Sequence, residues 1–190
     1  MRIGVLALQG AVREHMNSVR ACGAEPVEIK YREQLNTVQG LIIPGGESTA
    51  VGKLLVRHQM LEPLTAMGQA GFPIFGTCTG LILLAATING STQPRLNLMD
   101  IIVERNAFGR QIASFEADLP IKVLGEPAFH AVFIRAPYIV KAGAGVQVLA
   151  ALGEKILMAQ QGNLLAAAFH PELTDDLRIH RYFLNICSDR

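Results

Sequence analysis

The segment Phe75-Gly76-Thr77-Cys78-Thr79-Gly80 places a thiol between two glycines, after one apolar run and before another. This order of residue types predicts a strand, a sharp turn and a helix, with Cys78 at the turn. Side chains at positions 76 and 80 would collide with the strand or the helix of such a nucleophile elbow. A helix N-terminus also favours the thiolate form of a cysteine. Cys78 is therefore a candidate nucleophile, although many free cysteines are simply buried and inert.

A histidine and a carboxylate near the end of the chain are suitable partners for this thiol. Residues 164–169 form an apolar run that predicts a buried strand, and Pro171 favours an extended conformation at His170. Because alternate residues of an extended chain point to the same side, His170 and Glu172 are expected to share a face. Cys78, His170 and Glu172 would then be nucleophile, base and orienting group of a catalytic triad. The alternative is a histidine at a strand end beside a solvated glutamate.

A pair of glycines follows another apolar run, in Leu41-Ile42-Ile43-Pro44-Gly45-Gly46-Glu47-Ser48. Adjacent glycines allow backbone N–H groups to point into a cleft, where they can stabilise an oxyanion. The alternative is an ordinary tight turn before a helix that is capped by Ser48 or Thr49.

The composition indicates one domain, residues 1–190, with a substantial core, because 50% of the 190 residues are apolar. Charged residues make up 17%, below the usual share of about a quarter. Either a partner covers part of the surface or a large parallel sheet is buried. A net charge of +1 predicts no nucleic-acid partner. No apolar run approaches ~18 residues, so no membrane partner is expected, and residues 1–8 predict a first strand rather than a signal sequence.

The three cysteines Cys22, Cys78 and Cys187 are odd in number and widely spaced. This pattern predicts neither a disulfide framework nor a metal site, and we expect no metal and no cofactor. A reducing cytoplasm suits such free thiols. Cys22 and Cys187 fall on the apolar faces of predicted helices, where a role in core packing is favoured.

The first half of the chain alternates predicted strands with predicted helices, which indicates an α/β fold. The expected architecture is a three-layer, doubly wound, mostly parallel sheet with helices on both faces. Strands are predicted at 3–8, 27–30, 41–43 and 73–75, and helices at 13–22, 49–57, 61–70 and 81–87. Gln9, Gly45, Gly46 and Cys78 each follow a predicted strand. We expect them to converge, because ligands of such folds bind beyond the carboxyl ends of the strands.

The second half is less regular, and its strands are expected to be antiparallel extensions of the sheet. They are predicted at 101–105, 112–115, 121–124, 131–134, 146–152, 156–160 and 164–169. Thr174 or Asp175 is expected to cap a final helix that runs to about Cys187.

Together these motifs resemble the class I, or triad, glutamine amidotransferases, which have a flavodoxin-like sheet. The chain is more closely similar to the glutaminase subunits of pyridoxal 5′-phosphate synthase, over essentially its whole length. The elbow and the His-x-Glu pattern are common to the wider class, whereas the opening segment and the Arg-Asn-x-Phe-Gly-Arg-Gln segment point to this family. The resemblance rests on residues 4–15, 44–49, 76–78, 103–106, 108–111, 133–137 and 169–174.

The resemblance implies a glutaminase. Cys78 would attack the side-chain amide of glutamine, His170 would relay a proton to the departing ammonia, and Glu172 would orient His170. Glutamate would then be released, and the ammonia would pass to a synthase subunit that builds pyridoxal 5′-phosphate, a form of vitamin B6. Backbone N–H groups at Gly46 and Thr79 would form the oxyanion hole.

The resemblance also implies a set of binding residues. Substrate contacts would fall on Gly46, Glu47, Ser48, Arg105, Ile134 and Arg135. An arginine suits the α-carboxylate of glutamine, and a carboxylate or carbonyl suits its α-ammonium group. For the two arginines the alternative is a surface or interface ion pair. Gln9 and the helix after it would face the synthase subunit, which such glutaminases require for full activity.

Three departures from the family pattern bear on this expectation. Thr79 stands where the family usually has alanine, Tyr138 replaces a common histidine, and residues 50–53 lack a usual pair of arginines. Three alternatives remain open: a glutaminase of another synthase, a PfpI-like cysteine hydrolase and a non-catalytic partner-binding subunit. The PfpI-like hydrolases usually carry histidine directly after the nucleophile, where this chain has Thr79.

Overall fold

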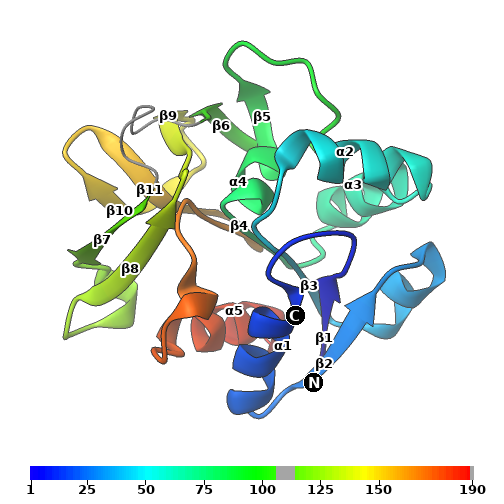
Figure 1. Cartoon of the computed structure of the whole chain (residues 1–190), viewed down its shortest axis with the longest axis horizontal. Helices are drawn as coiled ribbons and strands as arrows, with labels where there is room; N and C mark the ends of the chain where they lie inside the picture. The colour runs from blue at the N-terminus through cyan, green and yellow to red at the C-terminus, as the bar shows by residue number, and fades with distance from the viewer. Residues whose placement is uncertain (106–113, 189–190) are drawn as a thin grey trace.

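The computed structural model describes residues 1–105 and 114–188, which contain one large sheet and a separate hairpin (Figure 1). Within this part of the chain the large sheet has ten strands in the order β2-β1-β3-β4-β12-β11-β9-β6-β5, and β10 pairs with β11. These strands are β1 (Arg2–Leu6), β2 (Glu25–Ile29), β3 (Gly40–Ile43), β4 (Ile74–Thr77), β5 (Ala85–Ile88), β6 (Met99–Glu104), β9 (Tyr138–Ala142), β10 (Gln147–Leu152), β11 (Lys155–Gln161) and β12 (Leu164–Ala167). The hairpin consists of β7 (Ser114–Leu119) and β8 (Phe129–Ile134).

Helices cover both faces of the parallel half of the sheet. In Figure 1, α1 and α5 lie together on one side, and α2, α3 and α4 lie on the other. Their bounds are α1 (Val12–Ala21), α2 (Ser48–Arg57), α3 (Leu61–Gln69), α4 (Thr79–Leu84) and α5 (Arg178–Ser188). The predicted three-layer α/β architecture is confirmed.

The expected division into a parallel first half and an antiparallel second half is confirmed only in part. The strand predicted at 164–169 was expected to be antiparallel, but β12 pairs parallel with β4, and β6 pairs parallel with β5. Strands β2, β1, β3, β4 and β12 are mutually parallel. β3, β4 and β12 are buried along their whole length, as their continuous apolar runs predict. β11 pairs antiparallel with β12 and β9, and β9 pairs antiparallel with β6. Later strands therefore extend the sheet beyond β12.

Several predicted elements differ from the structure. The helix predicted at 81–87 ends at Leu84, and Ala85–Ile88 is strand β5. Both are buried apolar segments, which periodicity alone cannot distinguish. Residues 121–124 contain a 3-10 turn, Lys122–Leu124, instead of a strand. Strand β9 and the 3-10 helix Arg32–Thr37 were not predicted.

Two further expectations concern the strand predicted at 112–115 and the three cysteines. Of the strand predicted at 112–115, residues 112 and 113 lie outside the described residues, and β7 begins at Ser114. All three cysteines are free. Cys187 is buried against Gly40, as expected, whereas Cys22 follows the end of α1 and is only half-buried. In the described part of the chain, no helix is both long and apolar enough to span a membrane.

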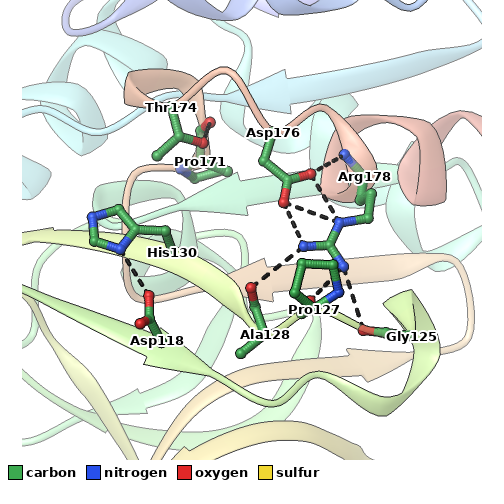
Figure 2. Close-up of polar contacts among 9 residues, drawn as sticks. All are labelled: Asp118, Gly125, Pro127, Ala128, His130, Pro171, Thr174, Asp176 and Arg178. Atoms are coloured by element: carbon green, nitrogen blue, oxygen red, sulfur yellow. Dashed lines mark hydrogen bonds and ion pairs between the residues drawn. The ribbon is translucent and has the colours of Figure 1, made fainter.

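Helix α5 begins at Arg178, later than the predicted caps Thr174 and Asp175, because Asp176 accepts the Arg178 backbone N–H at 3.0 Å. The Arg178 guanidinium donates to the same carboxylate and to the carbonyls of Gly125, Pro127 and Ala128 (Figure 2). One side chain thus ties the start of α5 to the segment that leads into β8.

Replacing Arg178 by alanine should lower the free energy of unfolding by about 1 kcal/mol, since its hydrogen bonds to Asp176 and to the three carbonyls are lost and solvent weakens such partly exposed contacts. Urea denaturation followed by circular dichroism measures the change. Arg181→Ala, an exposed arginine one turn later on α5, is the matched control and should have little effect. Equal stability of both variants would mean that the Arg178 contacts contribute nothing.

Candidate functional site

Cys78 lies in the sharp turn between β4 and α4, with φ +48° and ψ −96°. A positive φ is strained for a residue with a side chain, and such strain is typical of functional turns. A Cβ atom at position 76 would overlap the backbone of Gly80, and one at position 80 would overlap the carbonyl of Ile43. The predicted elbow, with its need for glycine on both sides of Cys78, is confirmed.

His170 follows β12, which pairs directly with β4, so the imidazole comes next to the elbow. A Cβ atom at position 45 would overlap the His170 ring and lie 3.4 Å from Cys78 Cβ. Gly45 therefore leaves the space in which the thiol and the imidazole meet. Interaction with the Cys78 side chain is one of the causes that raise the pKa of His170.

Glu172 contacts the other side of the imidazole, as Nδ1 of His170 lies 2.8 Å from Oε1 of Glu172. The sequence predicted that an extended chain would place His170 and Glu172 on one face, and this part of the prediction was wrong. The chain does not stay extended after His170 but turns into a 3-10 helix, Pro171–Leu173, whose Leu173 N–H donates to the His170 carbonyl. The proline at the first position of that turn sets it up, because its missing N–H needs no partner there.

Charge interactions favour the protonated form of this imidazole. Burial lowers the pKa of His170, but hydrogen bonds and charge interactions with Cys78 and Glu172 outweigh it and raise the pKa to about 10. Burial raises the pKa of Glu172, but His15 and His170 hold it below its usual range. The arrangement favours an imidazolium at His170, between Cys78 and the Glu172 carboxylate.

The thiol opens into a cavity of about 400 Å³. It is lined by Gly46, Glu47, Ser48, Cys78, Thr79, Ile82, Arg105, Ile134, Arg135 and His170. The predicted catalytic and substrate-binding residues that lie in or just after β3, β4, β6, β8 and β12 therefore line one cavity. Glu172 lies behind His170, and Gln9 lies behind the glycine turn. Ile82 was not predicted.

The predicted oxyanion residues contact each other. The Gly46 N–H donates to Thr79 Oγ1 at 3.2 Å, and the Thr79 hydroxyl donates to the Gly46 carbonyl at 2.6 Å. Both backbone groups of Gly46 are therefore engaged by one buried side chain. Next to them, the Glu47 N–H donates to Gln9 Oε1 at 3.0 Å. Gln9 thus holds the same turn from the outside.

Helix α2 is capped by Glu47, not by Ser48 or Thr49, because its carboxylate accepts the N–H groups of Thr49 and Ala50. Arg105 is held by Gln93, whose Oε1 accepts from the guanidinium at 2.9 Å and from the Ser48 hydroxyl at 3.3 Å. Gln93 was missed by sequence reasoning, since nothing in its irregular loop indicated a contact with Arg105.

Two buried histidines behind the predicted triad were also missed by the sequence analysis. His15 Nε2 lies 3.3 Å from Glu172 Oε2, and His15 Nδ1 lies 3.0 Å from His180 Nε2. His15 belongs to the segment 4–15 that carried the family resemblance, but it had no assigned role. Among the described residues, no group of three or more histidine, cysteine, aspartate and glutamate side chains has metal-binding geometry.

Comparison with known proteins agrees with this geometry. Residues 5–189 match the model of the SNO glutamine amidotransferase family. The chain is 67% identical to pyridoxal 5′-phosphate synthase subunit PdxT of Pelotomaculum thermopropionicum, over 98% of this chain and 95% of that protein. It is 60% identical to the PdxT subunit of Moorella thermoacetica, over 98% and 99% of the two chains. A crystal structure of a glutamine amidotransferase superposes with a TM-score of 0.94 at 48% identity, covering 98% of each chain.

Histidine NMR tests the electrostatics of the site. His170 should remain protonated as the pH rises, up to about 10, whereas buried His180, whose pKa is lowered to about 3, should stay neutral between pH 5 and 9. Cys78→Ala should lower the pKa of His170 by about one unit or more, because the thiolate partner is removed. The His170→Asn spectrum assigns the signal. An ordinary titration of His170 near pH 6.5 would refute the ion pair.

Proposed function

The chain belongs to the SNO glutamine amidotransferase family, and we propose that Cys78, His170 and Glu172 are the residues with which it hydrolyses glutamine. As a member it is a glutaminase that serves pyridoxal 5′-phosphate synthase, like the PdxT relatives. The observation that carries the residue assignment is the contact series from Cys78 through His170 to Glu172 at one end of a glutamine-sized cavity.

In the first half of the reaction, the Cys78 thiolate attacks the side-chain carbonyl carbon of glutamine. The carbonyl oxygen becomes an oxyanion, and the imidazolium of His170 gives its proton to the nitrogen that leaves as ammonia. The product of this half is a thioester between Cys78 and the glutamyl group. Glu172 keeps Nδ1 of His170 directed away from the thiol, so that the other ring nitrogen faces the reaction.

In the second half, a water molecule attacks the thioester while neutral His170 accepts its proton. The thiolate leaves, glutamate is released and His170 is again an imidazolium. No group outside the triad, the substrate and water is needed to balance these steps.

The charged ends of glutamine are assigned to the wall of the cavity. Arg105 and Arg135 line it and suit the α-carboxylate, and Gln93 supports this role by fixing the Arg105 side chain. Glu47 faces Arg105 and adds negative charge near the α-ammonium group. Gly46, Ser48 and Ile134 complete the proposed substrate contacts.

The same proposal includes the partner subunit, the domain organisation and the cellular location. Ammonia passes to the synthase subunit, and Gln9 is the proposed contact, since its side chain holds the Gly46–Glu47 turn next to Cys78. Residues 1–190 act as one glutaminase domain, supported by a large sheet that joins strands from both halves of the chain, including β1 and β12. A cytoplasmic location is supported by three free thiols, one of which is the nucleophile.

Thr79 is proposed to restrain the oxyanion hole. The Gly46 N–H donates to the Thr79 hydroxyl and is therefore not available to an oxyanion in this conformation. Hydrolysis then requires the Gly46 peptide to leave Thr79, and docking of the synthase against Gln9 acts on the neighbouring peptide. The Thr79 N–H would provide the second donor.

Glutamate release measures the proposed function directly. Activity should be low for the chain alone and rise on addition of the synthase subunit, and Cys78→Ala should reduce the stimulated rate by at least about 10³-fold. Binding of the variant to the synthase should remain unchanged in calorimetry. Cys22→Ala, a cysteine outside the cavity, is the control. Substantial turnover by Cys78→Ala would rule out this nucleophile.

Thr79→Ala tests the restraint on Gly46. The variant removes both hydrogen bonds to Gly46, so the rate of the isolated chain should rise by about 5- to 30-fold, the factors that correspond to about 1–2 kcal/mol. The stimulation by the synthase should fall accordingly. Thr79→Ser keeps the hydroxyl and should behave like the wild type. A slower Thr79→Ala variant would show that the hydroxyl supports the oxyanion hole instead of restraining it.

A further inference from the structure

The second oxygen of the Glu172 carboxylate, Oε2, is buried next to a histidine to which no role has been assigned. The Glu172 side chain is fully buried, and its Oε1 contacts His170. Oε2 makes no well-aligned hydrogen bond within the described residues, yet His15 Nε2 lies 3.3 Å from it. A buried carboxylate oxygen is costly unless a donor lies beside it. His15 is that donor by position.

His15 is itself held in place from two sides. Its ring is fully buried, with Nε2 also 3.1 Å from Thr77 Oγ1 and Nδ1 3.0 Å from His180 Nε2. Phe75 packs edge-on against both imidazoles. Because α1 carries His15 and α5 carries His180, both helices on this face of the sheet contribute to the position of the ring.

The hydrogen-bond network assigns the proton positions. Burial lowers the pKa of both histidines, so each ring is neutral at neutral pH and carries one N–H. If His15 donated through Nδ1, the His180 Nδ1–H would be a buried donor with no partner, and a lone pair of His15 would face the Glu172 carboxylate. If instead His180 donates to His15, only a bare lone pair of His180 is left over. The second arrangement avoids both penalties.

In that arrangement the His15 Nε2–H points between Thr77 Oγ1 and Glu172 Oε2. It is better aligned on the hydroxyl, and its positive end lies against the carboxylate. A carboxylate that is fixed at one oxygen cannot rotate freely about its last bond. The other oxygen is then presented to His170 in one orientation.

We propose that His15, itself oriented by His180, is a positioning residue for the triad: its Nε2–H fixes Glu172 so that Oε1 holds His170 against Cys78. This inference rests on the proposed triad and extends it by one contact. His15 touches neither substrate nor reacting atoms. Its effect should therefore appear in turnover and in the protonation of His170, and not in glutamine binding.

A pair of nearly isosteric variants tests the proposal in the complex with the synthase subunit. His15→Met removes the donor and should lower kcat by about 10- to 100-fold, as small misplacements of catalytic groups do. The KM for glutamine should change by less than about threefold, and the pKa of His170 in histidine NMR should fall. His15→Gln places an amide N–H near the position of Nε2 and should recover most of kcat and of the pKa. His58→Met, at an exposed histidine, is the control.

The outcomes separate a positioning role from a packing role. Folded His15→Met with wild-type kcat and an unchanged His170 pKa would overturn the proposal, as would His15→Gln that is as impaired as His15→Met. If His15→Met does not fold, His180→Met provides the second test and should lower kcat and the His170 pKa in the same direction. Unchanged values there would also overturn it.

Glu172→Gln in the same assay separates this inference from the proposed function. If Glu172→Gln is impaired and His15→Met is not, only the role of His15 fails. If Glu172→Gln turns over glutamine like the wild type, the triad fails, and the role of His15 fails with it.

Discussion

The close approach of backbone turns around Cys78 is the constraint on which the rest of the site depends. Gly80 packs against the Ile43 carbonyl, Gly45 against the His170 ring, and Gly10 against the Gly45 carbonyl. None of these positions has room for a Cβ atom. Such proximity requires β1, β3, β4 and β12 to be adjacent and parallel, so that the turns at their carboxyl ends meet. The sheet order is thus what brings the proposed nucleophile, Cys78, and its proposed base, His170, together.

A second constraint on the site is electrostatic. His170 and Glu172 carry opposite charges, and these attract each other more strongly because water is largely excluded. The buried neutral histidines behind Glu172 add dipoles without adding charge. This arrangement explains why the polar network extends through the core to α5, far from the cavity that glutamine would enter.

The turn Gly45-Gly46-Glu47 connects the proposed catalytic centre to the surface. On its inner side Thr79 engages Gly46, and on its outer side Gln9 engages Glu47, while the Ala11 N–H donates to the Gly45 carbonyl at 3.3 Å. A partner that contacts the segment before α1 would therefore act on the Gly45–Gly46 peptide, the proposed oxyanion peptide, through the Ala11 hydrogen bond and on the next peptide through Gln9. Two glycines in sequence make this turn able to respond, because their backbone has few steric barriers.

The sequence by itself determined the features that depend on neighbouring residues. The elbow around Cys78, the buried runs of β3, β4 and β12, and the parallel first half follow from turn chemistry and hydrophobic pattern. The motifs also placed Arg105, Ile134 and Arg135 among the candidate contacts. Only the tertiary structure decided which distant groups meet: Thr79 with Gly46, Gln93 with Arg105, and His15 with Glu172. It also decided that Ala85–Ile88 is a strand and that a 3-10 turn carries Glu172. The physical reason is that such contacts depend on the order and spacing of the strands, which no local pattern of residues specifies.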